Sequence, residues 1–474
     1  MSMESKDLID VGGTWTTPHG TERLTLVDPR SGEEFAEVVL ADETDIDTAV
    51  AAARRAFDSG PAWPLADRLA TLRRLADLIE ERTELFAETM SAEMGAPAAF
   101  ARMVHVGGSL GTLRTTIALA EAYPFREPLG PSTIVSEPVG VVGAITPWNF
   151  PLHQALTKIG SAVAAGCPVV LKPAENTPLT AYLLAEAAID AGFPTGWLSV
   201  LAGRGPVAGA ALAAHPDIDM VSFTGSTGVG KAIAGAAAAN LTRYSLELGG
   251  KSPAVILDDL DDAGFANAVR SGLGFCLFNS GQTCAAWTRL VVPEARYDDT
   301  VALVREIAAD YVPGENLGPL VSALQWDRVS AHLQRAVEDG AEVVYGDPHV
   351  ARPERGFHLA PVIFGRVTPQ MRLGQDEVFG PVLAIQTHTG DDDAVAIANS
   401  TAYGLSGAVF AADEERAIAV ADRIRSGVVH INGLNTNQSA PFGGFKSSGI
   451  GREYGRWGIE EFLEVKSIQP PARG

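Results

Sequence analysis

Cysteine is scarce in this chain, and that scarcity excludes two classes of protein. Only Cys167, Cys276 and Cys284 occur among 474 residues. They form no C-x-x-C pair and have no histidine cluster beside them, which argues against a disulfide framework and against a structural zinc site. We therefore expect no metal and a reducing compartment, the cytoplasm.

The sequence is also poor in basic residues and lacks long apolar runs. Lys and Arg total 36 against 58 Asp and Glu, and the net charge of -22 repels phosphate backbones and anionic headgroups. The sequence has no run of about 18 apolar residues, and its first residues, MSMESKDLIDVGG, lack the features of a secretory signal. We expect neither nucleic acid nor a membrane as a partner.

What the chain does contain is enough apolar sequence for several cores. Hydrophobic residues make up 46% of it, and a chain of this length divides into domains. Residues 42–57 and a longer stretch that ends at Gly95 have the periodicity of amphipathic helices. The Pro- and Gly-rich segment 121–140 favours a hairpin or arm that leaves the compact body.

Short apolar runs alternate with helical segments through most of the remaining sequence. Between residues 139 and 250 the runs are VGVVGAITP, PVVLKP, WLSVLAG, MVSFTGS and RYSLELGG, and the rhythm resumes from residue 252 to residue 432. Alternation at this spacing is typical of βαβ units, in which helices cover both faces of a parallel sheet. The sequence thus predicts an α/β fold with two doubly wound bodies.

Ligands bind beyond the carboxyl ends of parallel strands, so the residues that follow each run are candidates. In AITPWNFP, the Asn149 amide can donate to a developing oxyanion, or it simply caps the next helix. In VVLKPAENTP, Glu175 can accept from a ribose 2'-hydroxyl with Lys172 beside it, or the two form an exposed ion pair.

The segment SFTGSTGVGKAI has the form of a strand, a glycine turn and a helix start. Backbone N–H groups at such a start favour a pyrophosphate. The segment lacks G-x-G-x-x-G, and the phosphate-loop pattern fails where Ala232 follows Gly225, Gly230 and Lys231. Without that hydroxyl ligand for magnesium, a dinucleotide is favoured over nucleoside triphosphate hydrolysis.

Two further residues suggest covalent chemistry. Glu247 lies between two leucines, where burial should raise its pKa toward that of a general base, or it pairs with Lys251 or an arginine. Cys284 follows Gly281 and precedes two alanines that leave room beside its sulfur. It is either a reactive thiol or a buried inert one, the interpretation given to Cys167 and Cys276.

Together these segments, in this order, resemble the aldehyde dehydrogenase superfamily over essentially the whole chain. DEVFGPV, NSTAYGLSGAVF, SGVVHIN and PFGGFKSSGIGREYG complete the resemblance. It implies that Cys284 is the nucleophile and Glu247 the base, and that the Asn149 amide with the Cys284 backbone N–H forms an oxyanion hole. The implied reaction oxidises an aldehyde to a carboxylic acid through a cysteine thiohemiacetal and a thioester.

The same resemblance implies NAD as the cofactor, with NADP discouraged by Glu175 and not excluded by Lys172. The implied cofactor residues are Thr146, Pro147, Trp148, Lys172, Glu175, Gly225, Ser226, Gly230, Leu248, Glu377 and Phe379. The residues expected around a medium-sized or aromatic aldehyde are Phe150, His153, Gln154, Thr157, Thr283, Ala285 and Phe442.

The superfamily architecture divides the chain into three parts. Residues 1–117 and 139–249 would form a Rossmann-like NAD-binding domain, residues 250–450 a catalytic domain, and residues 118–138 with 451–474 a small β oligomerisation arm. The strand edges of such an arm need a partner, which implies a homodimer or a homotetramer.

Other functions are compatible with parts of this pattern. An enzyme that acylates coenzyme A would not need a base at Glu247, and a cysteine hydrolase without nucleotide would leave the cofactor motifs unexplained. A non-catalytic protein of the same fold would have no use for the set Cys284, Glu247 and Asn149. We therefore expect the hydrolytic dehydrogenase.

Overall fold

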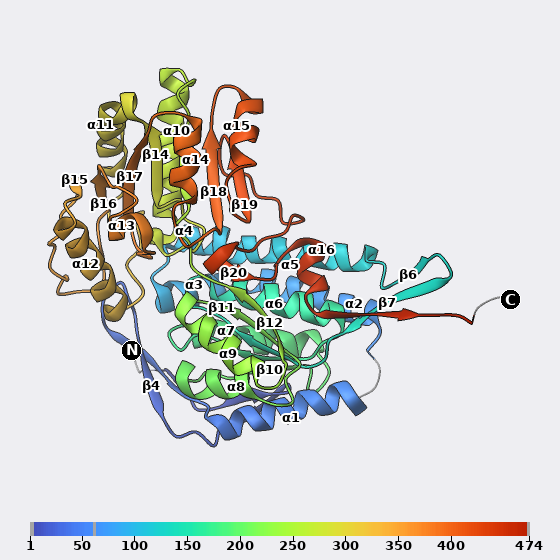
Figure 1. Cartoon of the computed structure of the whole chain (residues 1–474). Helices are drawn as coiled ribbons and strands as arrows, with labels where there is room; N and C mark the ends of the chain where they lie inside the picture. Colours follow the sequence, from blue (N-terminus) through green and yellow to red (C-terminus); the bar gives the residue numbers. More distant parts are fainter. Residues whose placement is uncertain (1–3, 60–62, 472–474) are drawn as a thin grey trace.

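The computed structural model describes residues 4–59 and 63–471, and the strands of these residues form four sheets (Figure 1). Two large sheets with their helices occupy the lower and upper parts of Figure 1. Two three-stranded sheets lie apart from them, one near the N-terminus and one in an arm that carries the C-terminal strand.

The first large sheet has a parallel centre and antiparallel edges. Its order is β20, β12, β11, β8, β9, β10, β2, β3. The parallel strands are β12 (Arg243–Glu247), β11 (Met220–Thr224), β8 (Val142–Ile145), β9 (Val169–Lys172) and β10 (Leu198–Val200). The antiparallel additions are β20 (Gly449–Ile450), β2 (Ile9–Val11) and β3 (Thr14–Thr16).

Both faces of this sheet are buried. Successive side chains of a strand point to opposite faces, and each face packs against its own set of helices. On β9, Val169 and Leu171 join one apolar cluster and Val170 joins another. The first cluster includes α2 (Leu65–Glu81), α5 (Gly108–Ala122), α6 (Pro151–Ala165) and α7 (Pro178–Ala191). The second includes α1 (Glu43–Ser59), α8 (Ala210–Ala214) and α9 (Thr227–Ala238).

The predicted helical opening section is confirmed. Helix α1 covers the expected residues, and the longer stretch divides into α2 and α3 (Thr83–Met94). Gly95 ends α3 in a left-handed conformation, with φ of +76°, which favours glycine. A short helix, α4 (Ala98–Phe100), and a π-helical stretch, Ala101–Gly107, then lead into α5.

The second large sheet is parallel except at one edge. Its order is β15, β16, β17, β14, β13, β18, β19. The parallel strands are β16 (Val362–Gly365), β17 (Val382–His388), β14 (Arg289–Pro293), β13 (Pro253–Ile256), β18 (Ser406–Phe410) and β19 (Val428–Ile431). The antiparallel edge strand is β15 (Glu342–Tyr345). The predicted pair of doubly wound bodies is confirmed.

Helices cover both faces of the second sheet as well. On β13, Ala254 and Ile256 pack with α10 (Asp262–Leu277) and α11 (Tyr297–Ala308). Val255 packs with α14 (Asp391–Asn399) and α15 (Glu414–Ala421). Helices α12 (Ala323–Glu338) and α13 (Arg372–Gln375) cover the β16 and β17 side.

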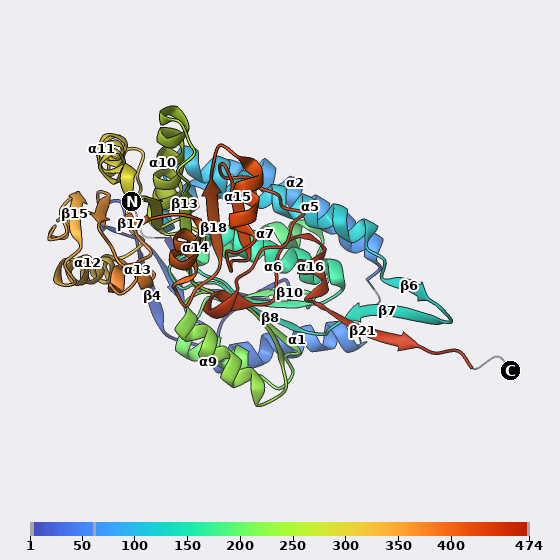
Figure 2. The same cartoon turned by 45° about the horizontal axis from the view of Figure 1, so that its top comes forward.

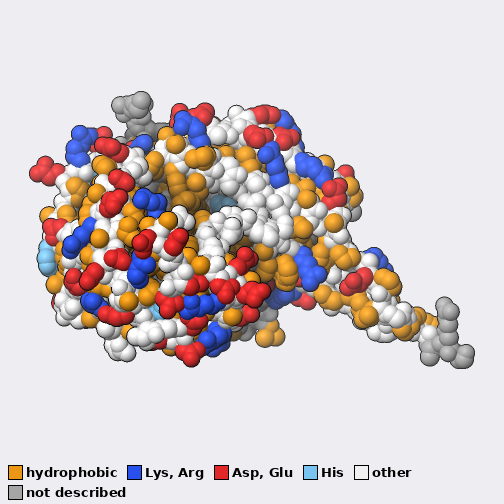
Figure 3. All heavy atoms as spheres, turned by 90° about the horizontal axis from the view of Figure 1, so that it is seen from above, with side chains coloured by type: hydrophobic (Ala, Val, Ile, Leu, Met, Phe, Trp, Pro, Cys, Tyr) orange, Lys and Arg blue, Asp and Glu red, His pale blue; other side chains and the backbone are white. Residues whose placement is uncertain are grey.

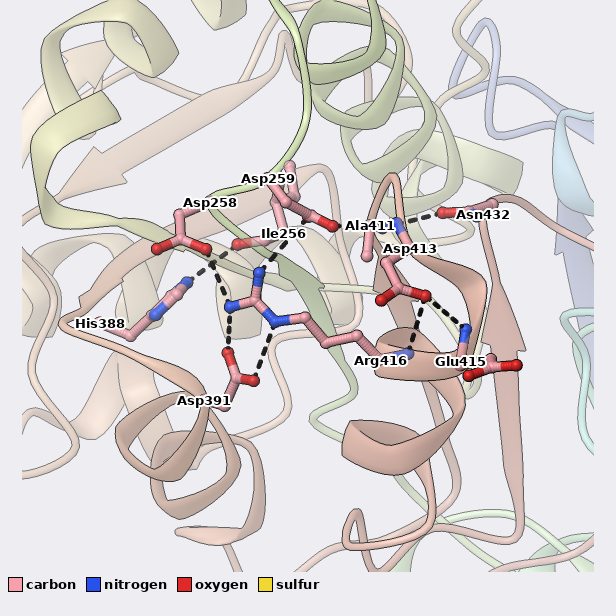
Figure 4. A network of polar contacts seen from close by, with 10 residues as sticks. All are labelled: Ile256, Asp258, Asp259, His388, Asp391, Ala411, Asp413, Glu415, Arg416 and Asn432. Atoms are coloured by element: carbon pink, nitrogen blue, oxygen red, sulfur yellow. Dashed lines mark hydrogen bonds and ion pairs between the residues drawn. The ribbon is translucent and has the colours of Figure 1, made fainter.

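An ion-pair network fixes α14 and α15 to the end of β13 (Figure 4). The Arg416 guanidinium lies 2.6 Å from the Asp391 carboxylate and 2.8 Å from that of Asp258. Figure 4 shows the Arg416 side chain extended between these two acids. Asp413 caps α15 by accepting from the backbone N–H groups of Glu415 and Arg416. The network is structural, and it lies outside the cavities described below.

The predicted hairpin is confirmed, and it forms an arm (Figure 2). Strands β6 (Arg126–Leu129) and β7 (Ser132–Pro138) are antiparallel, and β21 (Leu463–Ile468) adds to β7 after α16 (Gly455–Glu460). A Lys466–Glu137 ion pair joins β21 to β7. Figures 2 and 3 show this sheet projecting from the body, with hydrophobic side chains along it.

The N-terminal strands were not foreseen from the sequence. Strands β1 (Glu4–Lys6), β5 (Glu34–Val39) and β4 (Arg23–Val27) form the remaining sheet. The domain limits stay a prediction, and β20, which falls inside the predicted catalytic segment 250–450, pairs with β12 of the first sheet. Within the described residues, no helix combines the length and apolar character needed to cross a membrane.

Candidate active site

Cys284 lies in the loop between α10 and β14, after a strained turn. Asn279 and Ser280 have φ of 51° and 57°, values that non-glycine residues rarely adopt, and Gly281 follows at +73°. A Cβ on Gly281 would lie 2.0 Å from the Gly380 carbonyl oxygen. The turn therefore requires glycine here, and it carries Cys284 to a partly exposed position.

Cys284 lines two cavities at once. The apolar pocket has a volume of about 450 Å³, and Phe150, Phe278, Phe442 and Leu434 contribute to its wall. The polar cleft has a volume of about 250 Å³, and its wall includes Trp148, Ser226, Arg328, His332 and Glu377. Gln154 also lines both cavities. A group on the sulfur of Cys284 can thus be reached from either side.

Asn149 lies just before α6 and lines the polar cleft together with Cys284. Its side chain is buried, and its Nδ2 donates to the Gln282 carbonyl oxygen at 2.9 Å. Asn279 Nδ2 in turn donates to the Asn149 carbonyl oxygen at 3.0 Å. The alternative that Asn149 caps the following helix is wrong, because Phe150 is the N-cap and no side-chain bond caps α6. An amide has two N–H groups, so one remains for a ligand.

Glu247 ends β12 and is buried with no hydrogen-bond partner for either carboxylate oxygen among the described residues. Burial raises its pKa well above the ordinary value, and repulsion from Glu453 adds to the increase. The alternative of a pair with Lys251 is wrong, because the Lys251 Nζ also lacks a described partner. An orphaned carboxylate of this kind is suited to act as a base.

A buried ion pair behind Glu247 was missed from the sequence. Lys158 Nζ lies 2.6 Å from Glu453 Oε1 and 3.1 Å from Ser222 Oγ. Glu453 belongs to the quoted motif PFGGFKSSGIGREYG, but Lys158 comes from α6, almost 300 residues earlier. The motif that contains Glu453 was recognised in the sequence, but no local pattern indicated that Lys158 would pair with it.

The next residue of that motif, Tyr454, faces the apolar pocket. Its hydroxyl lies 2.7 Å from His153 Nε2, and both side chains line the pocket. Burial lowers the pKa of His153 and raises the pKa of Tyr454, so both groups are uncharged near neutral pH. The Tyr454 backbone has φ of 61°, a further strained position at this site.

The thiol of Cys284 is protonated near neutral pH in this state. Burial raises its pKa, and the negative charges of Glu377 and Glu247 raise it further. The Ala285 backbone N–H acts in the opposite direction. A thiolate here needs positive charge nearby, and a cationic ligand in the polar cleft would supply it.

The polar cleft fits a dinucleotide. The N-terminus of α9 opens at Ser226, which caps it with no side-chain bond, so its backbone N–H groups are free for an anion. A Cβ on Gly249 would lie 2.2 Å from the Glu377 carboxylate, so glycine lets that acid approach. Glu377 accepts from Gly250 N–H at 3.0 Å, and burial raises its pKa to about 7.

Most of the predicted cofactor residues surround this cleft. Pro147, Trp148, Gly225, Ser226, Leu248, Glu377 and Phe379 line it. Phe379 meets Trp148 edge to face, with ring centroids 5.4 Å apart. Gly230, in α9, packs against Leu248, which follows β12. A Cβ on Gly230 would lie 2.5 Å from the Leu248 side chain. Gln325, Arg328 and His332, which also line the cleft, were not predicted.

The other three predicted cofactor residues lie at the carboxyl ends of β8 and β9. Thr146 is buried, and its N–H donates to the Lys172 carbonyl oxygen at 3.2 Å. Lys172 Nζ is buried and donates to the carbonyl oxygens of Pro173 and Gly203. Glu175 lies 3.9 Å from that ammonium and is partly exposed. The alternative interpretation, an exposed ion pair, is therefore only partly right, because Lys172 is buried and Glu175 is partly exposed.

Six of the seven residues predicted around the aldehyde line the apolar pocket: Phe150, His153, Gln154, Thr283, Ala285 and Phe442. Thr157 does not. Its hydroxyl donates to the His153 carbonyl oxygen one turn back, and its side chain lies in a small cleft with Lys158 and Glu453. The helical phase of α6 turns it away from the pocket.

Three features together define a class of protein. They are a doubly wound sheet with a helix start at the cleft, a partly exposed cysteine that lines the same cleft, and an orphaned carboxylate near that cysteine. This is the class of oxidoreductases that combine a dinucleotide with a cysteine nucleophile. The model of the aldehyde dehydrogenase family matches residues 15–468. The chain belongs to that family.

Similar proteins agree with this assignment. A 3-succinoylsemialdehyde-pyridine dehydrogenase of Pseudomonas sp. is 40% identical over 468 residues, which are 97% of each chain. A solved structure of aldehyde dehydrogenase C from Pseudomonas syringae, a mutant with NAD+ and octanal, has a TM-score of 0.96 at 42% identity and covers 98% of both chains. The Mycobacterium tuberculosis aldehyde dehydrogenase with NAD+ has a TM-score of 0.94 at 40% identity over 99% of both chains.

Proposed function

We propose that the protein oxidises an aldehyde to a carboxylic acid with NAD, and that Cys284 is the residue on which the reaction occurs. One observation carries this proposal: Cys284 lines both the apolar pocket and the polar cleft. An aldehyde in the pocket and a nicotinamide in the cleft would meet at that residue. The similar structures that contain NAD+, one of them with octanal as well, support the two occupants.

The chemistry begins when the Cys284 thiol gives its proton to water and the thiolate sulfur forms a bond to the aldehyde carbon. The oxygen becomes an oxyanion in the resulting thiohemiacetal, and the free N–H of Asn149 and the Cys284 backbone N–H donate to it. When bound, NAD supplies an acceptor for the hydride that leaves this carbon. A thioester on Cys284 remains.

Release of the acid requires a separate base. Glu247 takes a proton from water, and the hydroxide adds to the thioester carbon. The C–S bond then breaks as the sulfur receives that proton back from Glu247, which gives the carboxylic acid and the thiol and restores the carboxylate. The orphaned carboxylate of Glu247 supports this role, because no described hydrogen bond occupies the oxygen lone pairs that accept the proton. Lys158 and Arg452 lower the pKa of Glu247 and so limit the effect of burial.

We assign the cofactor residues by position. Glu175 would accept from the adenosine ribose, with Lys172 beside it, and the start of α9 with Ser226 would hold the pyrophosphate. Glu377 would accept from the nicotinamide ribose, and Phe379 with Trp148 would flank that end of the cleft. The carboxylate of Glu175 repels a 2'-phosphate, so NAD is favoured over NADP.

The two alternatives receive no support from the site. Transfer to coenzyme A needs no base, whereas Glu247 is buried next to the nucleophile. A cysteine hydrolase needs a base on its thiol, and no hydrogen bond of the described residues joins a histidine to Cys284. His153, which lines the same pocket, is bonded to Tyr454.

A chemical trap tests the proposal. Glu247→Gln protein mixed with NAD and an aldehyde should produce NADH in one rapid burst, and mass spectrometry should find an acyl group on the peptide that contains Cys284. Wild-type protein should turn over continuously under the same conditions. An acyl group on another residue, or NADH formation without any adduct, would overturn the assignment of Cys284.

We also propose that the arm joins subunits and that the protein is a homodimer or homotetramer. Leu129, Val465 and Ile468 expose large apolar side chains on the arm, and β6 and β21 form its two edges. The backbone N–H and C=O groups of such edge strands can form hydrogen bonds with a strand of another copy. The division into an NAD-binding domain, a catalytic domain and this arm, and a cytoplasmic location, belong to the same proposal. Sedimentation velocity measures the assembly.

A further inference from the structure

The apolar pocket has no charged side chain in its wall. Among the described residues that line it, none is Lys, Arg, Asp or Glu. On the face seen in Figure 3, acidic and basic side chains are interspersed across the surface, which makes this gap in the charge distribution unusual for the molecule. A ligand in the pocket therefore meets no ionic partner.

The titratable groups of the pocket are held neutral. Burial lowers the pKa of His153 and of His430, so neither ring is cationic near neutral pH. Burial raises the pKa of Tyr454, which keeps the phenol protonated. Glu247 and Glu453 lie outside the pocket wall and raise the pKa of Cys284 and Tyr454, and the Lys158 ammonium lies 2.6 Å from the Glu453 carboxylate.

Aromatic rings make up much of the remaining wall, and its polar groups, such as Asn435, Asn437 and Gln438, are neutral. Phe150 and Phe278 lie with ring centroids 6.4 Å apart at an interplanar angle of 21°, and Phe275 and Phe442 add further rings. Leu434 contributes to the wall and is 48% exposed, so it marks the solvent side. Burial of apolar surface by these side chains favours a substrate of several carbons.

We propose that this pocket selects uncharged aldehydes with an apolar body, aliphatic or aromatic, and rejects aldehydes that carry a carboxylate. The inference rests on the proposed function. A carboxylate in this pocket gains at most neutral hydrogen-bond partners and no charged one, so the loss of its hydration is only partly compensated. An uncharged chain loses little and gains contact with the rings.

Matched pairs of aldehydes test this selection. Hexanal against 6-oxohexanoate, and benzaldehyde against 4-carboxybenzaldehyde, differ only in charge at similar length. The kcat/KM of the uncharged member should exceed that of the anion by about 100-fold or more. From propanal to hexanal, each methylene should raise kcat/KM by a factor of about four.

A variant at the mouth of the pocket sharpens the test. Leu434→Arg places a cation there without touching the residues assigned to catalysis, and the exposed position of Leu434 keeps the change out of the core. The ratio of 4-carboxybenzaldehyde to benzaldehyde in kcat/KM should rise at least about tenfold in this variant, because the carboxylate gains a partner. Leu434→Gln, polar and uncharged, should leave the ratio near that of the wild type.

The outcomes separate this inference from the proposed function. If anionic aldehydes are oxidised as well as the uncharged ones, and acyl groups still form on Cys284, the selection is wrong and the function stands. A preference for a quaternary ammonium aldehyde, which the aromatic rings would hold by cation–π contact, overturns the selection in the same way. If no aldehyde of any charge yields NADH, both fail.

Discussion

The apolar pocket and the polar cleft share Cys284 and Gln154 in their walls, yet the two cavities are lined by different kinds of side chain. The cleft lies at the carboxyl ends of parallel strands, with the start of α9, Arg328 and Glu377 available for a charged ligand. The pocket is walled by aromatic rings and neutral polar groups. The cleft thus recognises its ligand through charge and hydrogen bonds, and the pocket recognises its own through size and lack of charge.

The largest expected effect comes from removing the thiol of Cys284, a residue that lines both cavities. Cys284→Ala should lower turnover by at least about 10³-fold, since no other group can form the thioester. Binding of NAD, measured by calorimetry, should change little, because the cleft keeps its other walls. Cys276→Ala is the matched control: this buried thiol on α10 donates to the Val382 carbonyl oxygen, and its loss should leave turnover intact.

Glu247→Gln should separate the two halves of the reaction. Steady-state turnover should fall by roughly 10² to 10⁴-fold, while the first NADH burst remains, because only thioester hydrolysis needs the base. Rapid-mixing absorbance measures both phases. Since the pKa of Glu247 is raised by burial, wild-type hydrolysis should speed up as pH rises through that pKa and the carboxyl loses its proton. Loss of the burst in the variant would contradict the assignment.

Alkylation of Cys284 by iodoacetamide in the free protein should increase with pH. Its pKa is raised, so the thiolate fraction below that pKa grows about tenfold per pH unit. Mass spectrometry of the Cys284 peptide between pH 6 and pH 9 measures the rate. Addition of NAD should accelerate the reaction if the cleft places positive charge near the sulfur. A rate independent of pH would show that the thiol is already ionised.

A smaller effect is expected at the far end of the cleft. Glu175→Gln should lower the preference for NAD over NADP by about tenfold, since the amide no longer repels a 2'-phosphate. The measurement is kcat/KM for each coenzyme at a fixed aldehyde concentration. Glu354→Gln, a change at an exposed acid of the second body, should leave the preference unchanged. Unaltered preference in Glu175→Gln would remove this residue from coenzyme selection.

The comparison of the two cavities also shows what the sequence could reveal. The strand rhythm predicted both sheets, and because strand ends share one edge, it placed Asn149, Glu247 and the glycines of 225–230 together. The position of Cys284 opposite them came from the family resemblance. Local patterns could not predict that Thr157 turns away from the pocket, because this depends on the exact phase of α6.

Contacts between distant segments were the main features that the sequence did not predict. Lys158 and Glu453 are separated by 295 positions, and neither has a local signal that names the other. The N-terminal strands are only three to six residues long, too short for a clear alternation. Arg328 and His332 reach the cleft from α12, whose sequence pattern shows only an amphipathic helix.

The tight fit of Gly281 against Gly380 has a consequence for directed evolution. Since any side chain at position 281 would collide with the carbonyl of residue 380, these two loops form a unit that random libraries should leave untouched. Diversity is better placed at positions such as Leu434, where the wall meets solvent and no backbone is in the way. New aldehyde preferences can then be screened without disturbing the coenzyme end.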